Sequence, residues 1–166
     1  MKRLLVNLLF FLAALSVQIG FIASLPGFLS YAPLVFSVGV FLIQHIGSRS
    51  GVYWIVGFGL VLDALSLSAF PAEVLSYAAA AAVAYASARY LFSNRSWYGL
   101  IACGAASVLS MGVVRAAILG TVLLRHPERV SWGAFGGSVV WNLLLTAVLL
   151  TILFLTSKRL RTRFLL

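Results

Sequence analysis

Long apolar runs separated by short polar breaks dominate the sequence from one end to the other. A membrane-spanning helix needs about 20 largely apolar residues, with a usual range of about 17–25. Most of the runs have this length, and the breaks between them hold proline, glycine and charged residues. The pattern therefore predicts an all-α protein, a bundle of six transmembrane helices at residues 4–25, 29–46, 51–70, 73–92, 98–124 and 132–156.

The second of these runs is short and irregular. Its strongly apolar part covers residues 32–46, and Pro33 stands near its start, a position that suits proline in a helix. Three alternatives remain open for this segment: it extends back to Phe28, it is tilted in the membrane, or it is partly re-entrant.

The fourth run is unusual because small residues make up most of it, including an unbroken alanine stretch at residues 78–82. Small side chains let helix backbones approach closely, and close packing is a main attraction between helices in lipid. We therefore expect this helix to lie at the centre of the bundle and to be the span least exposed to lipid.

The composition supports a membrane protein over a soluble one. Hydrophobic residues make up 63% of the 166-residue chain and charged residues only 9%, whereas soluble domains carry about 25% charged residues. So few charges cannot cover a surface exposed to water, and the apolar surface must face a lipid bilayer. We expect a single integral membrane domain over residues 1–166.

The net charge of +9 is explained by topology better than by a nucleic-acid partner. The basic residues lie at the ends of apolar runs and form no stripe interleaved with aromatic residues. With six spans, nine of them fall on one side of the membrane and two on the other, and the basic side is normally cytoplasmic. Both termini are therefore expected in the cytoplasm. The nine are Lys2, Arg3, Arg49, Arg89, Arg95, Lys158, Arg159, Arg161 and Arg163, and the two are Arg125 and Arg129.

Two charged residues, Asp63 and Arg115, stand well inside apolar runs. A charge at membrane depth costs about 2.5–3.5 kcal/mol on insertion scales, so it marks a paired or functional residue. From the helical rise, Asp63 lies about 10 Å and Arg115 about 13 Å below the outer ends of their helices. We expect a salt bridge between these two side chains. A contact of one of them with a ligand or a partner protein is the alternative.

The uncharged polar residues of the spans are expected to form hydrogen bonds between helices, because such bonds hold helices together in lipid. The aromatic residue Trp54 stands near a predicted helix end and is expected in the headgroup zone. Trp141 stands deeper and is expected to pack between helices. The uncharged polar residues are Asn7, Gln18, Gln44 and Asn142.

Motifs of catalytic chemistry are absent from the sequence. It holds no Gly-x-Ser-x-Gly turn, no His-Glu-x-x-His helix, no phosphate loop and no dinucleotide fingerprint. The chain has only three acidic residues, and its single cysteine, Cys103, has no partner for a disulfide or a zinc site. We therefore expect a protein that is not an enzyme and that holds neither a metal nor an organic cofactor.

The third run carries a more specific pattern. Residues 51–63 read G-V-Y-W-I-V-G-F-G-L-V-L-D, followed by Ala-Leu-Ser. With Pro33-Leu34 at the start of the second segment and the small-residue fourth helix, this stretch resembles the MreD family of rod shape-determining proteins. The family's third helix has a glycine-rich pattern that ends in aspartate, then leucine and serine. The resemblance covers about residues 28–98 and rests on Gly57, Gly59 and Asp63.

The resemblance implies a function in cell shape. MreD-like proteins are multi-pass proteins of the bacterial inner membrane and belong to the elongasome, the machinery of cell elongation. They act as adaptors that bind the protein MreC and help to couple MreB filaments to the peptidoglycan synthases of the cell wall. The family is also similar to the six-helix substrate-binding subunits of energy-coupling-factor vitamin transporters, and such a subunit is the alternative function.

Overall fold

The chain is almost entirely helical in the part that the structure, a computed structural model, describes: residues 2–66, 70–92, 95–123 and 131–164. The predicted all-α class is confirmed, since no strand occurs within these ranges. Short π-helical or 3-10 turns, labelled η, extend or link several of the helices. The elements are α1 Lys2–Ser16, η1 Val17–Phe21, η2 Ile22–Ser24, η3 Gly27–Tyr31, α2 Leu34–Phe41, η4 Leu42–Ile46, α3 Ser50–Ser66, α4 Ala72–Ala86, η5 Ser87–Leu91, α5 Trp97–Leu123 and α6 Trp132–Phe164.

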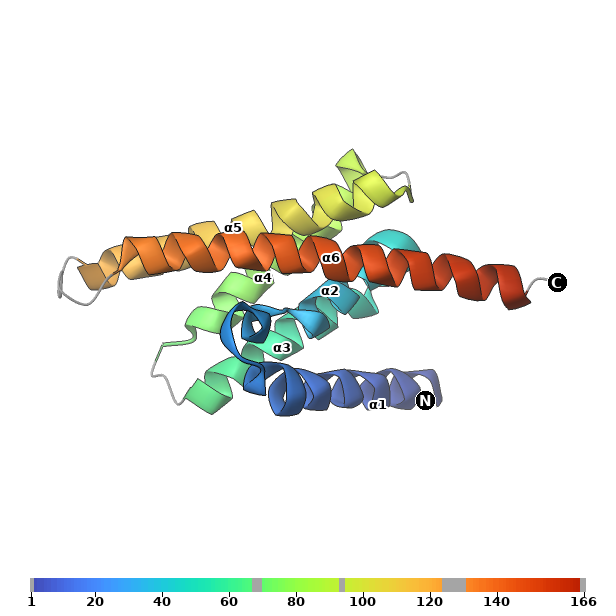
Figure 1. Cartoon of the computed structure of the whole chain (residues 1–166), viewed down its shortest axis with the longest axis horizontal. Coiled ribbons are helices and arrows are strands. Elements are labelled where there is room, and N and C mark those ends of the chain that lie inside the picture. Colours follow the sequence, from blue (N-terminus) through green and yellow to red (C-terminus); the bar gives the residue numbers. More distant parts are fainter. Residues whose placement is uncertain (1, 67–69, 93–94, 124–130, 165–166) are drawn as a thin grey trace.

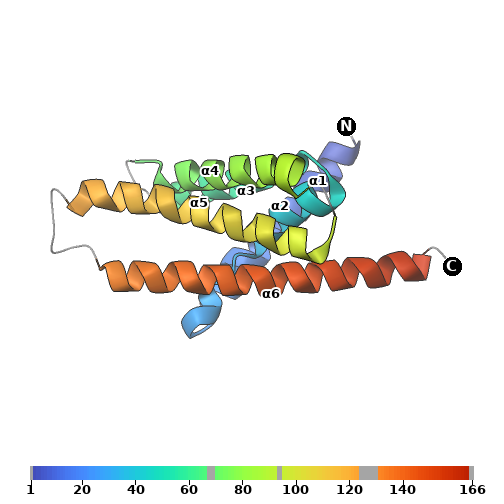
Figure 2. The ribbon, with the colours of Figure 1, turned by 90° about the horizontal axis from the view of Figure 1, so that it is seen from above.

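The helices form a bundle in which both chain termini lie at the same end (Figure 1). α6 runs alongside α5 in the opposite direction, as both ribbon views show (Figures 1 and 2). α4 packs mainly between α3 and α5, and α2 contacts α1, α3, α5 and α6. We call the end with the termini the terminal end and the other the distal end.

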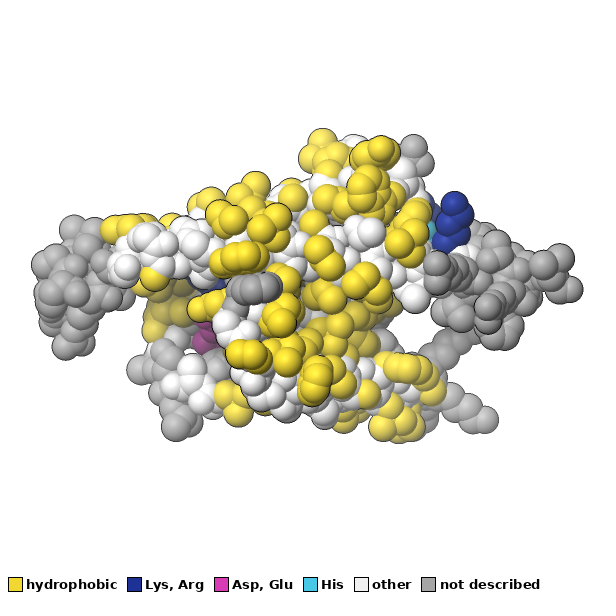
Figure 3. All heavy atoms as spheres, viewed as in Figure 1, with side chains coloured by type: hydrophobic (Ala, Val, Ile, Leu, Met, Phe, Trp, Pro, Cys, Tyr) yellow, Lys and Arg dark blue, Asp and Glu magenta, His cyan; other side chains and the backbone are white. Residues whose placement is uncertain are grey.

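Among the residues that the structure describes, three helical stretches are long and apolar enough to cross a membrane: Leu5–Ser24, Trp97–Thr121 and Trp132–Lys158. Leu34–Ile46 and Ser50–Ser66 are shorter apolar helices. The outer faces of the bundle are largely hydrophobic, and basic side chains are visible at the terminal end (Figure 3). These features are the ones that a helical membrane protein requires.

The second segment forms a shorter helix than its predicted range of 29–46. The chain makes the 3-10 turn η3 first, and α2 begins only at Leu34. α2 has 8 residues and its π-helical continuation η4 has 5, which together rise only about 20 Å. A hydrocarbon core is about 30 Å thick, so this helix by itself falls short of a full crossing.

The most buried helix is α2, so the expectation that the alanine-rich fourth helix is the least exposed one is wrong. Six of the eight residues of α2 are buried, against five of the fifteen of α4. Ala80 and Ala84 are fully buried, as the small-residue argument requires. α2 is more enclosed because it meets four other helices, whereas α4 lies mainly between two.

Close helix approaches in the core occur at glycines. A Cβ built on Gly39 of α2 would lie 2.5 Å from Ile55 Cγ1 and 3.1 Å from the carbonyl oxygen of Gly51, both on α3. A Cβ on Gly104 of α5 would lie 2.5 Å from a methyl carbon of Leu150 on α6. These glycines bring α2 onto α3 and α5 onto α6 at distances that alanine would not permit without a shift.

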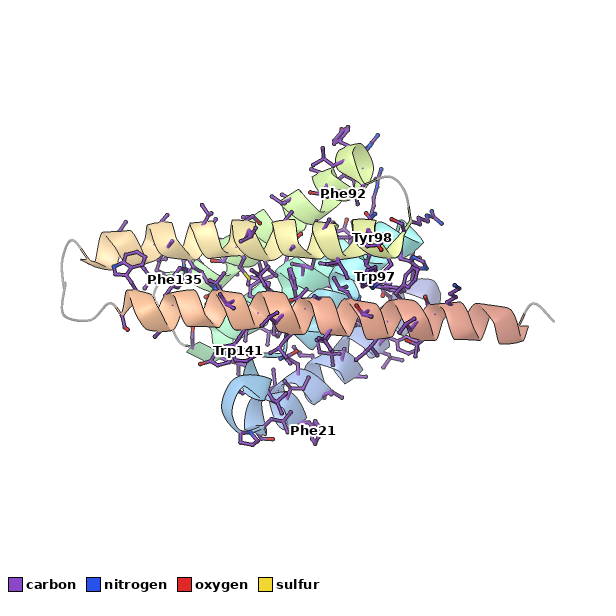
Figure 4. The ribbon with its side chains drawn as sticks, turned by 45° about the horizontal axis from the view of Figure 1, so that its top comes forward. Phe21, Phe92, Trp97, Tyr98, Phe135 and Trp141 are labelled. Atoms are coloured by element: carbon purple, nitrogen blue, oxygen red, sulfur yellow. The ribbon has the colours of Figure 1, made fainter. Side chains whose placement is uncertain are left out.

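Trp54 does not have the exposed position that was expected for it in the headgroup zone. Trp54 is buried, and its Nε1–H donates a 3.0 Å hydrogen bond to Asn7 Oδ1 on α1. Trp141 is 40% exposed, and Figure 4 shows it pointing away from α5. Trp54 stands about one turn inside α3, where Asn7 of α1 provides a hydrogen-bond acceptor for its indole N–H.

Candidate functional site

The junction between α3 and α4 at the distal end brings Asp63, Glu73 and Arg115 together. A break at Phe70–Pro71 separates the helices, and the Ala72 N–H donates to the Phe70 carbonyl oxygen over 2.8 Å. Pro71, at the N-cap position of α4, makes no side-chain capping bond. The first N–H groups of α4 therefore need acceptors from elsewhere in the chain.

Asp63 of α3 supplies those acceptors. Its Oδ1 accepts a 3.0 Å hydrogen bond from the Glu73 N–H, and its Oδ2 accepts a 2.8 Å bond from the Val74 N–H. A carboxylate at a helix N-terminus is stabilised both by these bonds and by the helix dipole. The aspartate is thus a cap that reaches from one helix to the next.

Arg115 of α5 pairs with Glu73 of α4. Its Nη2–H donates to Glu73 Oε2, and this is the ion pair of the described part of the chain. The Arg115 guanidinium also lies over the Tyr77 ring, 5.6 Å from the centroid, which is a cation–π geometry. Both charged side chains keep some access to the surface, with 28% exposure for Arg115 and 30% for Glu73.

The predicted salt bridge between Asp63 and Arg115 is wrong, because Arg115 pairs with Glu73 instead. Both residues do lie in one cluster, but Glu73 stands between them: its backbone binds Asp63 and its side chain binds Arg115. Asp63 is drawn to two N–H groups that have no helical partner, and Arg115 takes the remaining carboxylate. Glu73 is the first residue of the predicted fourth span, 73–92, and the span prediction gave it no partner. The order Pro-Ala-Glu at a helix start was the available signal, because acidic residues favour the first turn.

Gly59 lies one helical turn before Asp63 and faces the same junction. A Cβ built on Gly59 would lie 2.9 Å from Tyr77 Cβ, 3.1 Å from the Glu73 carbonyl oxygen and 3.1 Å from Val74 Cα. Gly57 lies on another side of α3, where an added Cβ would be 3.4 Å from the ring of Phe11 on α1. Of the two predicted glycines, only Gly59 belongs to the charged cluster.

Pro33 is the N-cap residue of α2 and lies apart from this cluster. Its position leaves the first N–H groups of α2 without a local side-chain acceptor. Gln18, in the π-helical turn η1, fills that role: its Oε1 accepts from the Leu34 N–H at 2.6 Å, and its Nε2–H donates to the Ala32 carbonyl oxygen at 2.9 Å. The expected interhelical bonding of Gln18 is confirmed.

Of the other uncharged polar residues, two bond to another segment and one bonds within its own helix. Asn7 accepts from Trp54, and Gln44 Nε2–H donates to the Phe92 carbonyl oxygen beyond η5, so both bond to another segment as expected. Asn142 Nδ2–H instead donates to the Ser138 carbonyl oxygen, one turn earlier in α6. For Asn142 the prediction of an interhelical bond is wrong.

A cavity of about 300 Å³ borders the ion pair. Phe135, one of its lining residues, lies near the start of α6, at the opposite end of the bundle from Trp97 (Figure 4). The Arg115 Nε atom is buried and has no hydrogen-bond acceptor among the described residues. The lining residues are Ala72, Glu73, Arg115, Ile118, Leu119, Phe135 and Ser138.

The cluster is suited to holding three helices together. Asp63, Glu73 and Arg115 are engaged with backbone amides or with each other, so two of the three carboxylates of the chain have structural partners.

Cys103 is a buried free thiol whose Sγ lies 3.4 Å from the Ala84 carbonyl oxygen. Within the described ranges, no group of three histidine, cysteine or acidic side chains has metal-site geometry.

Comparison with known proteins adds no relative: no family model, no curated protein and no solved structure matches the chain.

Proposed function

We propose that this chain is a non-enzymatic adaptor of the bacterial cell-elongation machinery, in the inner membrane, where it binds an MreC-like protein. Through that protein it supports rod shape and peptidoglycan synthesis together with MreB filaments. The proposal rests on the resemblance of residues 28–98 to MreD and on what the motif residues do within the fold.

The observation that supports the proposal most strongly is the joint role of Gly59 and Asp63. Residues four apart share one face of a helix, and here both face the start of α4. Gly59 leaves room for the α4 backbone, while Asp63 binds the N–H groups of Glu73 and Val74. A glycine and an aspartate at this spacing therefore serve one purpose, which gives the MreD-like pattern a structural reason.

The exposed apolar faces offer contact surfaces for a partner with a membrane anchor. Only 11% of the apolar window of α6 is buried in the bundle, and the same holds for α1. Leu144 and Val148, one turn apart on α6, are 52% and 54% exposed. In a membrane such a face meets either lipid or the helix of another protein.

The proposed topology has six passes with both termini in the cytoplasm. The nine-to-two distribution of basic residues supports it, as does the position of both termini at one end of the bundle. The short α2 and η4 would complete the second pass together with the turn η3. A reporter fused after Leu166 should be active as a cytoplasmic fluorescent protein and inactive as alkaline phosphatase. Phosphatase activity at this position would contradict the six-pass topology.

Partner binding is tested by co-expression with the MreC-like protein of the same genome, followed by affinity purification in mild detergent. A photo-crosslinking amino acid at Leu144 or Val148 should then yield a product with the MreC-like protein. The same amino acid at Leu150, which is fully buried on α6, is the matched control and should yield none. Failure of the two proteins to co-purify would contradict the adaptor function.

The cavity beside Arg115 is the observation that favours a second function, that of a substrate-binding subunit of an energy-coupling-factor vitamin transporter. Its volume of about 300 Å³ is at the lower limit for small-molecule sites, and it lies at the proposed outer end of the bundle. Mass spectrometry of the small molecules released from purified protein distinguishes the two functions. A stoichiometric vitamin would support the transporter subunit and count against the adaptor.

A further inference from the structure

A second cavity, of about 270 Å³, lies at the terminal end of the bundle. It is formed by the end of η4, the turn after it, the end of α4 with η5, and Arg95, two residues before the start of α5. Two arginines, Arg89 and Arg95, line it together with Ser48 and Tyr85. Its lining therefore combines two positive charges with hydroxyl groups, which is the chemistry that binds a phosphate group.

The arginines of this cavity have no carboxylate partner among the described residues. The ion pair of that part of the chain, Glu73 with Arg115, belongs to the distal junction, where Asp63 also lies. Arg89 donates a 3.3 Å hydrogen bond to the Tyr85 hydroxyl and lies 5.8 Å from the Tyr90 ring centroid. Both contacts leave its positive charge uncompensated, so an anion is the missing complement.

The backbone turn at Gly47 forms part of the lining of this cavity. Gly47 has a φ of 74°, in the left-handed region that favours glycine. A Cβ at this position would lie 3.3 Å from Nη2 of Arg95. The absence of a side chain thus lets the Arg95 guanidinium lie close to the turn.

An apolar groove of about 450 Å³ starts beside the cavity, and Tyr85 lines both. The groove runs between α3 and α4, where Val52 and the alanines Ala81 and Ala82 leave space. Arg49 stands among its lining residues and adds a third positive charge at the same end. A basic cavity that shares Tyr85 with a neighbouring apolar groove matches the two chemistries of a phospholipid, whereas a free phosphate ion would use only the basic cavity.

The surrounding side chains agree with a position at the membrane surface. Tyr53 and Tyr90 are 75% and 76% exposed, and exposed tyrosines are typical of the headgroup zone. Basic pockets between helices on the cytoplasmic side are suited to anionic headgroups. From this geometry we propose that the terminal end carries a specific site for an anionic phospholipid, with the headgroup phosphate between Arg89 and Arg95 and an acyl chain in the α3–α4 groove. The lipid site requires only that the chain lies in a membrane. The proposal is therefore independent of whether the chain binds an MreC-like protein.

The test uses the full chain, purified in detergent and depleted of lipid. Phosphatidylglycerol should raise the melting temperature and remain bound in native mass spectrometry, and phosphatidylcholine should do so much less. Arg89→Gln and Arg95→Gln should each weaken phosphatidylglycerol binding roughly tenfold, because each removes one charge-assisted contact. Lys158→Gln, which removes a charge from α6 outside both the cavity and the groove, is the matched control and should bind as the parent does.

A second variant tests the groove without changing charge. Ala82→Phe should fill it and weaken phosphatidylglycerol binding, and it remains informative if an arginine variant does not fold. Equal binding of the two lipids by the parent chain would overturn the site, as would equal losses in Lys158→Gln and the arginine variants. If inorganic phosphate alone gave the same stabilisation, unaffected by Ala82→Phe, the cavity would be an ion site and the phospholipid proposal would be wrong.

Discussion

The backbone N–H of Val74 donates a 2.8 Å hydrogen bond to Oδ2 of Asp63, which ties the start of α4 to the last turn of α3. The other carboxylate oxygen accepts from the neighbouring Glu73 N–H at 3.0 Å. The motif aspartate thus acts as a helix cap supplied from a different helix. The consequences for stability can be measured.

Removal of the Asp63 cap should destabilise the fold. We expect Asp63→Ala to lower the free energy of unfolding by about 2 kcal/mol, because two N–H groups lose their acceptor and the helix dipole loses a counter-charge. Asp63→Asn should cost less, since its amide oxygen still accepts one bond. Equilibrium unfolding in mixed micelles of dodecyl maltoside and SDS measures both. Ser16→Ala, which removes an exposed hydroxyl bonded only to the Leu12 carbonyl oxygen, is the control. A loss no larger than that of the control would refute the capping role.

The ion pair of Glu73 and Arg115 should show a strong energetic coupling. Glu73→Gln alone leaves a positive charge at membrane depth without its partner, and Arg115→Met alone leaves a negative one. Each should cost about 2 kcal/mol, since both side chains are partly exposed. The double variant should cost less than the sum by about 1–2 kcal/mol.

A second cycle distinguishes this arrangement from a direct bond between Asp63 and Arg115. The losses of Asp63→Asn and Arg115→Met should add within about 0.5 kcal/mol, because the two side chains make no direct contact. A coupling in this cycle that exceeds the one between Glu73 and Arg115 would contradict the observed partners.

The two motif glycines should respond differently to alanine. Gly59→Ala places a methyl group 2.9 Å from Tyr77 Cβ and 3.1 Å from backbone atoms of α4, and we expect a loss of about 1–3 kcal/mol from the forced separation. Gly57→Ala meets only the Phe11 ring at an ordinary 3.4 Å. Alanine is the better helix former by about 1 kcal/mol, so this variant should be neutral or stabilised. Folded yield and SDS unfolding report both, and equal effects would show that the α3–α4 approach is not limiting.

Loss of the Gln18 side chain should loosen the start of α2 specifically. Gln18→Leu has a similar size but leaves the Leu34 N–H and the Ala32 carbonyl oxygen without partners, at a cost of about 2 kcal/mol. Amide hydrogen exchange at Leu34 should accelerate more than exchange at buried positions of α5. Asn142→Leu, whose amide bonds only within α6, should leave exchange at Leu34 unchanged. Unchanged exchange in Gln18→Leu would rule out the cap.

The helical class and the three long apolar helices could be predicted from the sequence, because a single apolar segment in lipid can satisfy its backbone hydrogen bonds only as a helix. A chain segment without water must satisfy its own N–H and C=O groups, and the α-helix does so locally. The helices at residues 5–24, 97–121 and 132–158 therefore follow from the length and apolarity of each run, without reference to the rest of the chain. The ends of the helices follow from Pro26, Pro71 and the glycine at position 47.

The partners of the polar groups could not be predicted, because they depend on the rotation and axial position of each helix. Depth alone placed Asp63 near Arg115, and the two residues do belong to one cluster. The choice between Arg115 and the N-terminus of α4 as the partner of Asp63 required the position of the Phe70–Pro71 break in space. The burial of Trp54 depended in the same way on Asn7, which lies 47 positions away in the sequence.

The bonds between Gln18 and the start of α2 have a consequence for biosynthesis. A ribosome releases α1 and η1 before α2, so the acceptor for the Leu34 N–H is already in place when α2 emerges. The stretch Leu5–Ser24, formed by α1 with η1 and η2, is long and apolar enough to cross a membrane by itself, whereas the apolar helix Leu34–Ile46 is too short. We therefore expect this segment to enter the bilayer as the second arm of a hairpin, so that the N-to-C order of synthesis becomes part of the folding pathway. A circular permutant in which α1 is translated last would present α2 to the translocon with no partner.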